Sequence, residues 1–315
     1  MLKPLTNAFV LVSVMDQTEH ILIAGGSGTI GRLIRKAFEK AGHRVTVLSR
    51  SSSGPGYASW DPAQDTIDTA ALADATVLIN LSGEQIAPGR WTDSRKKRIR
   101  DSRTESTLFL AWCLKNLPNS IHTVINASAS GYYGDSGSTL VDETSPPGEG
   151  FMGTTCVKWE KAAAAYSGPG IRVLIVRMGI ILDPHSGLLA EILKPARFGI
   201  IPLLGSGRQY LSWIHPSDLA GILLHLIGKK ELSGVFNTSS PEPVTMRHMA
   251  AAIKSALHSQ ALIFSVPSLL LQLVLGEVSA TVITGQRVSC EKIIQSGYAF
   301  QFGRLDDALI NLLHG

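Results

Sequence analysis

The feature that most constrains the fold of this chain is a glycine-rich turn between an apolar run and an amphipathic segment. Residues 21–24 are apolar, the turn Gly25-Gly26-Ser27-Gly28-Thr29-Ile30-Gly31 follows, and apolar residues then recur at helical spacing as far as Ala41. This pattern predicts a buried strand, a tight turn and a helix. Gly42 is a helix stop signal, and residues 45–48 are predicted to form a second strand. The whole segment is therefore predicted to be a βαβ unit.

The rest of the chain continues this α/β pattern and then changes in character. Short apolar runs with little alternation occur at 77–81, 124–127 and 173–176, with room for a crossover helix between them. Strands that are buried on both faces of a parallel sheet have this composition. We therefore predict an α/β protein with a doubly wound parallel Rossmann-type sheet.

Domain boundaries follow from shifts in composition. Residues 19–180 are predicted to form the dinucleotide-binding domain, with later segments returning to it. Proline and glycine punctuate short elements after Arg177, so 181–315 is predicted to be a smaller C-terminal substrate lobe with a tail. Residues 1–18 are interpreted as a loose N-terminal extension, in which Met15 is an alternative start.

The glycine turn also predicts a ligand. Glycines let the backbone turn sharply and approach a pyrophosphate, whose charge then lies at the positive end of the following helix. A strand-to-helix turn without a ligand would use the same residues, but the strand before and the helix after favour dinucleotide binding. The predicted cofactor-binding residues of this turn are Gly25, Ser27, Gly28, Thr29, Ile30 and Gly31.

The end of the second strand predicts which dinucleotide binds. An acidic residue there would bond the ribose of NAD, whereas this chain has Arg50 and Ser51 and no carboxylate before Asp61. A guanidinium can pair bidentately with a 2′-phosphate. The alternative for Arg50 is a solvated surface arginine. We predict NADP(H) as the cofactor.

Composition limits the other partners. The 29 Lys and Arg residues against 25 Asp and Glu residues give a net charge of only +4, so no nucleic-acid partner is expected. No apolar run approaches the ~20 residues of a membrane span, and no membrane partner is expected. The three separated cysteines are typical of a reducing, cytoplasmic compartment. The histidines show no ligand spacing, so no metal is expected.

Taken together, these motifs resemble the extended short-chain dehydrogenases, and within them an epimerase-family branch with a distinctive C-terminal tail domain. The resemblance covers residues 21 to about 312. Besides the glycine turn, it is carried by Asn80-Leu81-Ser82-Gly83, Arg90-Trp91, Ser102-Arg103, Trp213-Ile214-His215 with Asp218, Leu275-Gly276-Glu277, Gly285-Gln286-Arg287 and Gly297-Tyr298.

The resemblance has implications for binding. It implies that Asn80, Leu81, Ser82 and Gly83 line the cofactor channel and that Arg103 reaches the cofactor from a helix. It also implies a small carbonyl or sugar-nucleotide-like substrate, and a homodimer formed through helices near 102–117 and 156–166. The basic residues 95–97 are interpreted as a solvated helix face.

The catalytic pattern of the wider superfamily is broken here. Its hydride-transferring members use a Tyr-xxx-Lys pair with a serine, because the lysine lowers the pKa of the tyrosine. No tyrosine of this chain has a lysine four residues later, and Cys156 and Glu160 stand in those two places. Ala129 stands in the place of the serine. The candidate catalytic residues are Ser128, Ser130 and Tyr133, with Glu143 as a further possible proton carrier.

Two functions are consistent with these observations. The first is an NADP(H)-binding oxidoreductase or epimerase that acts on a small substrate. The alternative is a catalytically weak or inactive NADP(H)-binding sensor or scaffold, which the missing Tyr-xxx-Lys pair keeps open. His215 is predicted to be structural, at the start of a helix whose Asp218 bonds backbone amides.

Overall fold

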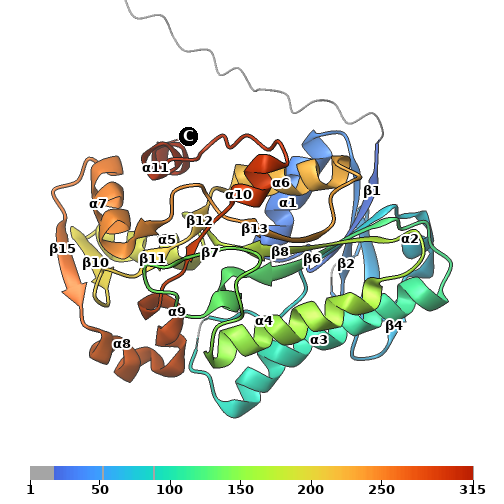
Figure 1. Cartoon of the computed structure of the whole chain (residues 1–315), viewed down its shortest axis with the longest axis horizontal. Coiled ribbons are helices and arrows are strands. Elements are labelled where there is room, and N and C mark those ends of the chain that lie inside the picture. The colour runs from blue at the N-terminus through green and yellow to red at the C-terminus, as the bar shows by residue number, and fades with distance from the viewer. Residues whose placement is uncertain (1–17, 52, 88, 315) are drawn as a thin grey trace, which may run out of the picture.

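The computed structural model describes residues 18–51, 53–87 and 89–314. It is built on an eight-stranded sheet with the order β13-β8-β6-β5-β1-β2-β3-β4, in which only the β3–β4 pair is antiparallel (Figure 1). The predicted doubly wound parallel sheet is confirmed. The expectations about residues 1–17, including Met15, lie outside the described residues. The sheet strands are β1 (His20–Ala24), β2 (Arg44–Ser49), β3 (Tyr57–Asp61), β4 (Thr66–Ile67), β5 (Val77–Asn80), β6 (Thr123–Ala129), β8 (Arg172–Met178) and β13 (Gly234–Thr238).

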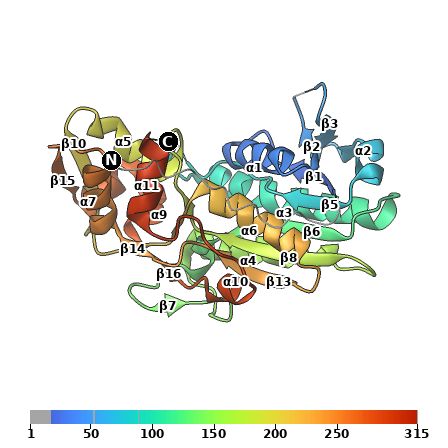
Figure 2. The same ribbon diagram turned by 90° about the horizontal axis from the view of Figure 1, so that it is seen from above.

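Helices cover both faces of this sheet (Figures 1 and 2). One face packs against α1 (Thr29–Lys40) and α6 (Pro216–Gly228), and the other against α3 (Asp93–Asn116) and α4 (Gly150–Ala163). The short elements of this domain are α2 (Thr69–Asp74), η1 (Ser130–Tyr133), β7 (Leu140–Val141) and η2 (Ala164–Tyr166). The central strands are buried from both sides, which explains why their sequences are apolar without alternation.

Helix α1 follows the predicted pattern closely. Its buried residues are Gly31, Ile34 and Phe38, which share one face because they are three and four residues apart. The helix ends at Lys40, and Gly42 lies just beyond with a φ of +90°, a conformation that favours glycine.

The C-terminal part forms a second, smaller core. This core surrounds the fully buried Trp213 and includes Leu189 and Met249. Residues 216–238 leave it and return to the main sheet as α6 and β13. The other elements are β9 (Ile180–Ile181), α5 (Gly187–Ala196), β10 (Ile200–Leu204), β11 (Tyr210–Leu211), β12 (Trp213–Ile214), β14 (Val244–Thr245), α7 (Met246–Ala256), β15 (Leu262–Val266), α8 (Ser268–Leu275), η3 (Gly276–Ser279), α9 (Ala280–Ile283), β16 (Arg287–Val288), α10 (Glu291–Gln295) and α11 (Leu305–His314).

The order of the sheet identifies the place where a ligand would bind. Strand β1 pairs with β2 on one side and with β5 on the other, so the strand order reverses at β1. In open α/β sheets, ligands bind in the crevice beyond the carboxyl ends of the strands at such a reversal. In this chain that edge lies beyond Ala24 of β1 and Asn80 of β5.

Candidate dinucleotide site

The exposed part of the glycine turn is the segment that follows its first two glycines. Ser27 and Gly28 are exposed, and Gly28 is the N-cap of α1 with an ordinary φ of −70°. A Cβ added at Gly28 would meet only the Gly25 carbonyl oxygen, at 3.3 Å. The first turn of a helix carries N–H groups without helical partners, so this end of α1 can receive an anion. Thr29 and Ile30 are half-buried in the same turn.

Gly25 and Gly31 have packing roles that require glycine. Gly25 has a φ of +79°, and an added Cβ would lie 2.7 Å from the Leu81 carbonyl carbon and oxygen. A Cβ at Gly31 would overlap the Gly26 backbone. These approaches hold the turn against the loop after β5 and hold α1 against β1. Contact of Gly25 and Gly31 with a cofactor remains a prediction.

The end of β2 presents cationic and hydroxyl groups to solvent. Arg50 is exposed and makes no hydrogen bond or ion pair with any described residue, and Ser51 beside it is also exposed. Arg32, which the sequence analysis did not select, donates a hydrogen bond to the Ser27 carbonyl at 2.5 Å. Two arginines are therefore available near the positive end of α1. Arg32 could have been identified from the sequence, because it directly follows Gly31, the last glycine of the turn.

The side chains of Asn80 and Ser82 are directed into the protein. Asn80 is fully buried, and its amide donates to Thr107 and Asn126, both at 2.9 Å. Its carbonyl oxygen accepts from the Ser82 backbone at 3.1 Å and from the Ser82 hydroxyl. These buried hydrogen bonds fix the conformation of the loop after β5. A cofactor contact by this segment would therefore come from the backbone around Leu81 and Gly83.

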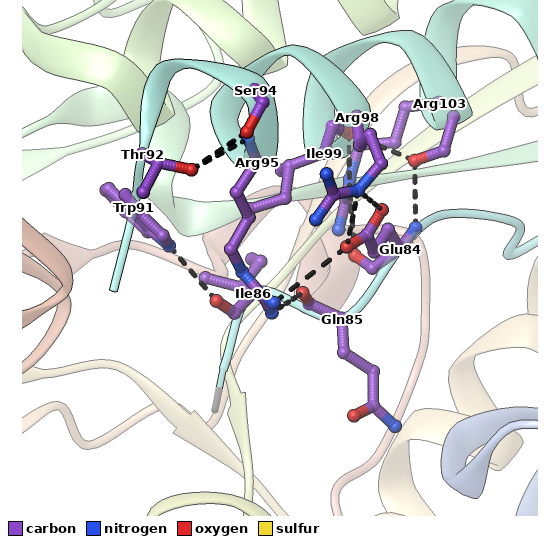
Figure 3. Close-up of polar contacts among 11 residues, drawn as sticks. Glu84, Gln85, Ile86, Trp91, Thr92, Ser94, Arg95, Arg98, Ile99 and Arg103 are labelled. Atoms are coloured by element: carbon purple, nitrogen blue, oxygen red, sulfur yellow. Dashed lines mark hydrogen bonds and ion pairs between the residues drawn. The ribbon is translucent and has the colours of Figure 1, made fainter. Parts of the chain in front are cut away.

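The loop after β5 is tied to α3 by a cluster around Glu84 (Figure 3). The Glu84 carboxylate pairs with Arg98 at 3.2 Å and with Arg95 at 3.9 Å. Arg95 also donates to the Gln85 carbonyl at 3.0 Å, and Lys96 binds Glu277 of η3 at 3.0 Å. The interpretation of residues 95–97 as a solvated face was therefore wrong for Arg95 and Lys96. Because their carboxylate partners lie at distances of 11 and 181 residues along the chain, helical periodicity could not reveal them.

Arg103 is a buried cation that has no carboxylate partner among the described residues. It is 8% exposed, and Nη1 donates to the carbonyls of Glu84 at 3.0 Å and Ile99 at 2.7 Å. Its guanidinium lies over the Trp159 ring, 5.2 Å from the centroid. Burial lowers its pKa. A buried cation without a counter-ion is stabilised by a bound anion, which agrees with the phosphate role expected for Arg103.

Glu160, at the superfamily's lysine position, forms a buried ion pair with Arg177 at the end of β8. Nε and Nη2 of Arg177 donate to the two carboxylate oxygens at 2.9 Å and 2.8 Å. Burial opposes the charge of Arg177, but hydrogen bonds to Glu160 and Tyr133 outweigh it and raise its pKa. Arg177 was not among the site residues predicted from the sequence. It could have been found as a charged residue at the end of an apolar strand, because a charge that is buried there needs a partner of opposite charge.

Tyr133 belongs to the same network, and its hydroxyl both accepts and donates a hydrogen bond. Its hydroxyl accepts from Arg177 at 2.9 Å and donates to Asn237 at 2.7 Å. Burial raises the pKa of Tyr133 to about 12, against the effect of Arg177. Glu143 accepts from the Asn237 backbone at 2.7 Å. Tyr133 and Glu143 therefore join loops and strands, and Tyr133 is poorly suited to release a proton.

Ser128, Ser130 and Cys156 lie around the carboxyl end of β6. The Ser128 hydroxyl donates to Glu160 at 2.6 Å, and Ser130 begins η1 and is 7% exposed. Burial, with a smaller contribution from Glu160, raises the pKa of Cys156 to about 11. Burial is the larger of these two causes. The thiol is therefore neutral at physiological pH.

His215 and Asp218 have the structural roles that the sequence predicted. His215 caps α6, because its Nδ1 accepts from the Ser217 N–H at 3.1 Å, and its ring stacks on Phe302. Burial lowers the pKa of His215 to about 4. Asp218 accepts from the backbone N–H groups of Gln301 at 2.8 Å and Phe302 at 2.9 Å.

Comparison with known proteins identifies the family. The model of the NAD dependent epimerase/dehydratase family matches residues 21–238, more than half of the chain. The chain belongs to this family. A second model, described as a domain of unknown function (DUF1731), matches residues 266–312, so the resemblance to a branch with its own tail domain is confirmed.

Members of the family with similar sequences match this chain over nearly its whole length. The epimerase family protein Mb2239 of Mycobacterium bovis is 33% identical over 92% of this chain and 96% of its own. The crystal structure of the human epimerase family protein SDR39U1 with NADPH has a TM-score of 0.85 and 33% identity, covering 93% of this chain and 98% of the human one. A nucleoside-diphosphate sugar epimerase of Corynebacterium glutamicum has a TM-score of 0.76 and 28% identity, covering 94% of this chain and 58% of its own.

Two searches of the described residues bear on metals and membranes. Among residues 18–51, 53–87 and 89–314, no group of three or more His, Cys, Asp or Glu side chains could hold a metal ion. In the same part of the chain, no helix has the length and apolar character required to cross a membrane.

Proposed function

We propose that this chain binds NADP(H) in the crevice between β1 and β5 and uses it as an oxidoreductase or epimerase acting on a small substrate. The observation that carries the proposal is the open N-terminus of α1 at Gly28, together with the exposed and unpaired Arg50 at the end of β2. The residues fit the cofactor, because α1 begins after Gly28 and the N–H groups of its first turn have no helical partners, an arrangement that binds phosphate. The human relative was solved with NADPH, which supports the choice of dinucleotide.

The proposal assigns a contact to each part of the cofactor. Backbone N–H groups of Ser27, Thr29 and Ile30 would bind the pyrophosphate, and Arg50 with Ser51 would bind the 2′-phosphate. The backbone of Leu81 and Gly83 would line the channel, and Arg103 would supply a buried positive charge beside it. Residues 181–315, except the returning segment 216–238, would form the substrate lobe.

The chemistry of the cofactor is hydride transfer at the nicotinamide. This chain would support it with a proton route in place of the missing Tyr-xxx-Lys pair. The Ser128 hydroxyl is committed as a donor to Glu160, so its oxygen can accept a proton from a substrate hydroxyl and relay one to the carboxylate. Arg177 already donates to both oxygens of the Glu160 carboxylate, which leaves this carboxylate less available to take up a proton, so we propose that turnover is slow.

We also propose a class of substrate, a cellular compartment and an oligomeric state for this protein. The printed name of the Corynebacterium glutamicum relative supports a substrate of the sugar-nucleotide class. Cys113, Cys156 and Cys290 are free and buried, which supports a reducing, cytoplasmic compartment. Leu108 and Trp112 of α3 are exposed side chains that support a homodimer formed through this helix.

Titration of NADPH against wild type and Gly28→Val tests the cofactor site. Valine should abolish binding, because it fills the space where the pyrophosphate meets the backbone, whereas within the protein its Cβ would press on the Gly25 carbonyl oxygen alone, at 3.3 Å. Gly168→Val is the matched control, since a Cβ at Gly168 would meet nothing within 4 Å and Gly168 lies far along the chain from the turn. Retained binding by a folded Gly28→Val protein would mean that the turn is only structural.

A further inference from the structure

A large apolar surface is exposed at one end of the C-terminal lobe. Six of its side chains are more than 60% exposed, and they are Phe198, Leu262, Phe264, Leu269, Leu273 and Val274. We call this group the lobe patch. It contains most of the strongly exposed large apolar side chains in the described part of the chain. A contiguous exposed apolar surface of this kind marks an interaction site.

The lobe patch is built from the turn before β10, from β15 and from α8, which are neighbours in the fold. Strand β15 pairs in parallel with β10, so Leu262 lies beside Ile200 and Phe264 lies beside Pro202. Pro267 joins β15 directly to α8. Figure 1 shows β15 and α8 at the end of the molecule that is opposite β2 and β4. Only Leu271 of α8 is buried, so the other leucines of this helix face outward.

The charges around the lobe patch are positive. Residues 198–207 and 259–276 contain no Asp, Glu, Lys or Arg. At the edges, Arg197 lies over the Phe198 ring at 4.9 Å, and Arg90 donates to the Leu273 carbonyl at 2.5 Å. Neither arginine forms an ion pair with a described residue. The nearest acidic residue along the chain from α8, Glu277, is already held by Lys96.

We propose that the lobe patch docks this protein on an anionic membrane surface. The leucines and phenylalanines would enter the boundary between headgroups and acyl chains, while Arg90 and Arg197 would pair with lipid phosphates. This inference goes beyond the proposed function. It also departs from the expectation of no membrane partner, which rested on the absence of a spanning segment, because peripheral binding needs none.

A second copy of the chain fits the lobe patch less well. In a two-fold symmetric contact, each patch meets the same patch of its partner. Such a contact would bring the Arg90 and Arg197 edges of both copies together, with only Glu277, already paired with Lys96, to offset their charge, and like charges facing each other are unfavourable. An anionic membrane surface instead offers acyl chains to the apolar side chains and lipid phosphates to the two arginines.

Flotation of the full chain with phosphatidylcholine vesicles, with and without phosphatidylglycerol, tests the proposal. Wild type should float with the anionic vesicles, and Leu269→Glu/Leu273→Glu should bind them at least tenfold more weakly. Arg197→Gln should reduce the preference for anionic over neutral vesicles. Ile310→Glu is the matched control, because Ile310 is a 54% exposed apolar residue on α11, outside the lobe patch, and it should bind like wild type. Circular dichroism checks that every variant is folded.

Three results would overturn the proposal. The first is equal flotation of wild type and the double variant, and the second is no flotation of wild type. The third is a concentration-dependent dimer in sedimentation velocity that the double variant abolishes while vesicle binding is absent. That third outcome would make the lobe patch an interface between copies of the chain.

Discussion

His215 is predicted to make the stability of this protein fall in mild acid. Burial lowers its pKa to about 4, from 6.5 in the unfolded chain, so the folded state favours the neutral ring. The stabilising effect is therefore complete above pH 6.5 and is lost as the pH falls from 6.5 towards 4. Each pKa unit corresponds to about 1.36 kcal/mol. At pH 5 the loss from this one ring should be about 2 kcal/mol.

Urea unfolding at pH 7.5 and pH 5, followed by circular dichroism, measures this effect. His215→Asn removes the titrating ring, while asparagine remains a good N-cap that can accept from the Ser217 N–H. The variant loses its stacking on Phe302 at every pH, but between the two pH values it should lose about 2 kcal/mol less than wild type. His248→Asn, at an exposed histidine, should keep the wild-type pH dependence. An identical pH dependence in wild type and His215→Asn would refute the reasoning.

Two further predictions concern the network around β6 and β8. Glu160→Gln should destabilise the fold by about 3–5 kcal/mol, because Arg177 would stay buried without its counter-ion. Glu191→Gln, in the exposed pair with Lys194, should cost under about 1 kcal/mol in the same urea unfolding experiment, and equal losses would argue against the buried pair. Cys156→Ser and Cys156→Ala should leave NADPH oxidation within a few-fold of wild type, since the pKa of about 11 keeps the thiol neutral. A loss above a hundredfold in both variants, with cofactor binding unchanged, would identify Cys156 as catalytic.

The fold could be predicted from the sequence where local patterns determine the structure. The apolar runs, the glycine turn and Gly42 each act over a few residues, and the structure has β1, α1 and β2 where these patterns indicated. The capping role of His215 and the backbone bonds of Asp218 were predictable for the same reason. These motifs are defined by short, fixed spacings.

The interior of the candidate site was less predictable because its contacts join distant segments. Glu160 appeared to be a substitution for a lysine of α4, but its partner Arg177 lies on strand β8, 17 residues later. The side chain of Asn80 turns inward because Thr107 and Asn126 meet it there, which no pattern around Asn80 shows. The outward orientation of Leu269 also depends on the packing of the lobe and not on the composition of α8.

The central claim is that Arg50 gives this protein its preference for NADP(H), and a titration with both dinucleotides tests it most directly. NADPH should bind at least about tenfold more tightly than NADH, which corresponds to about 1.4 kcal/mol, and Arg50→Ala should remove most of that difference. Arg44→Ala, at the other end of β2, is the matched control and should leave the preference unchanged. Equal affinities of the wild type for NADPH and NADH would contradict the claim.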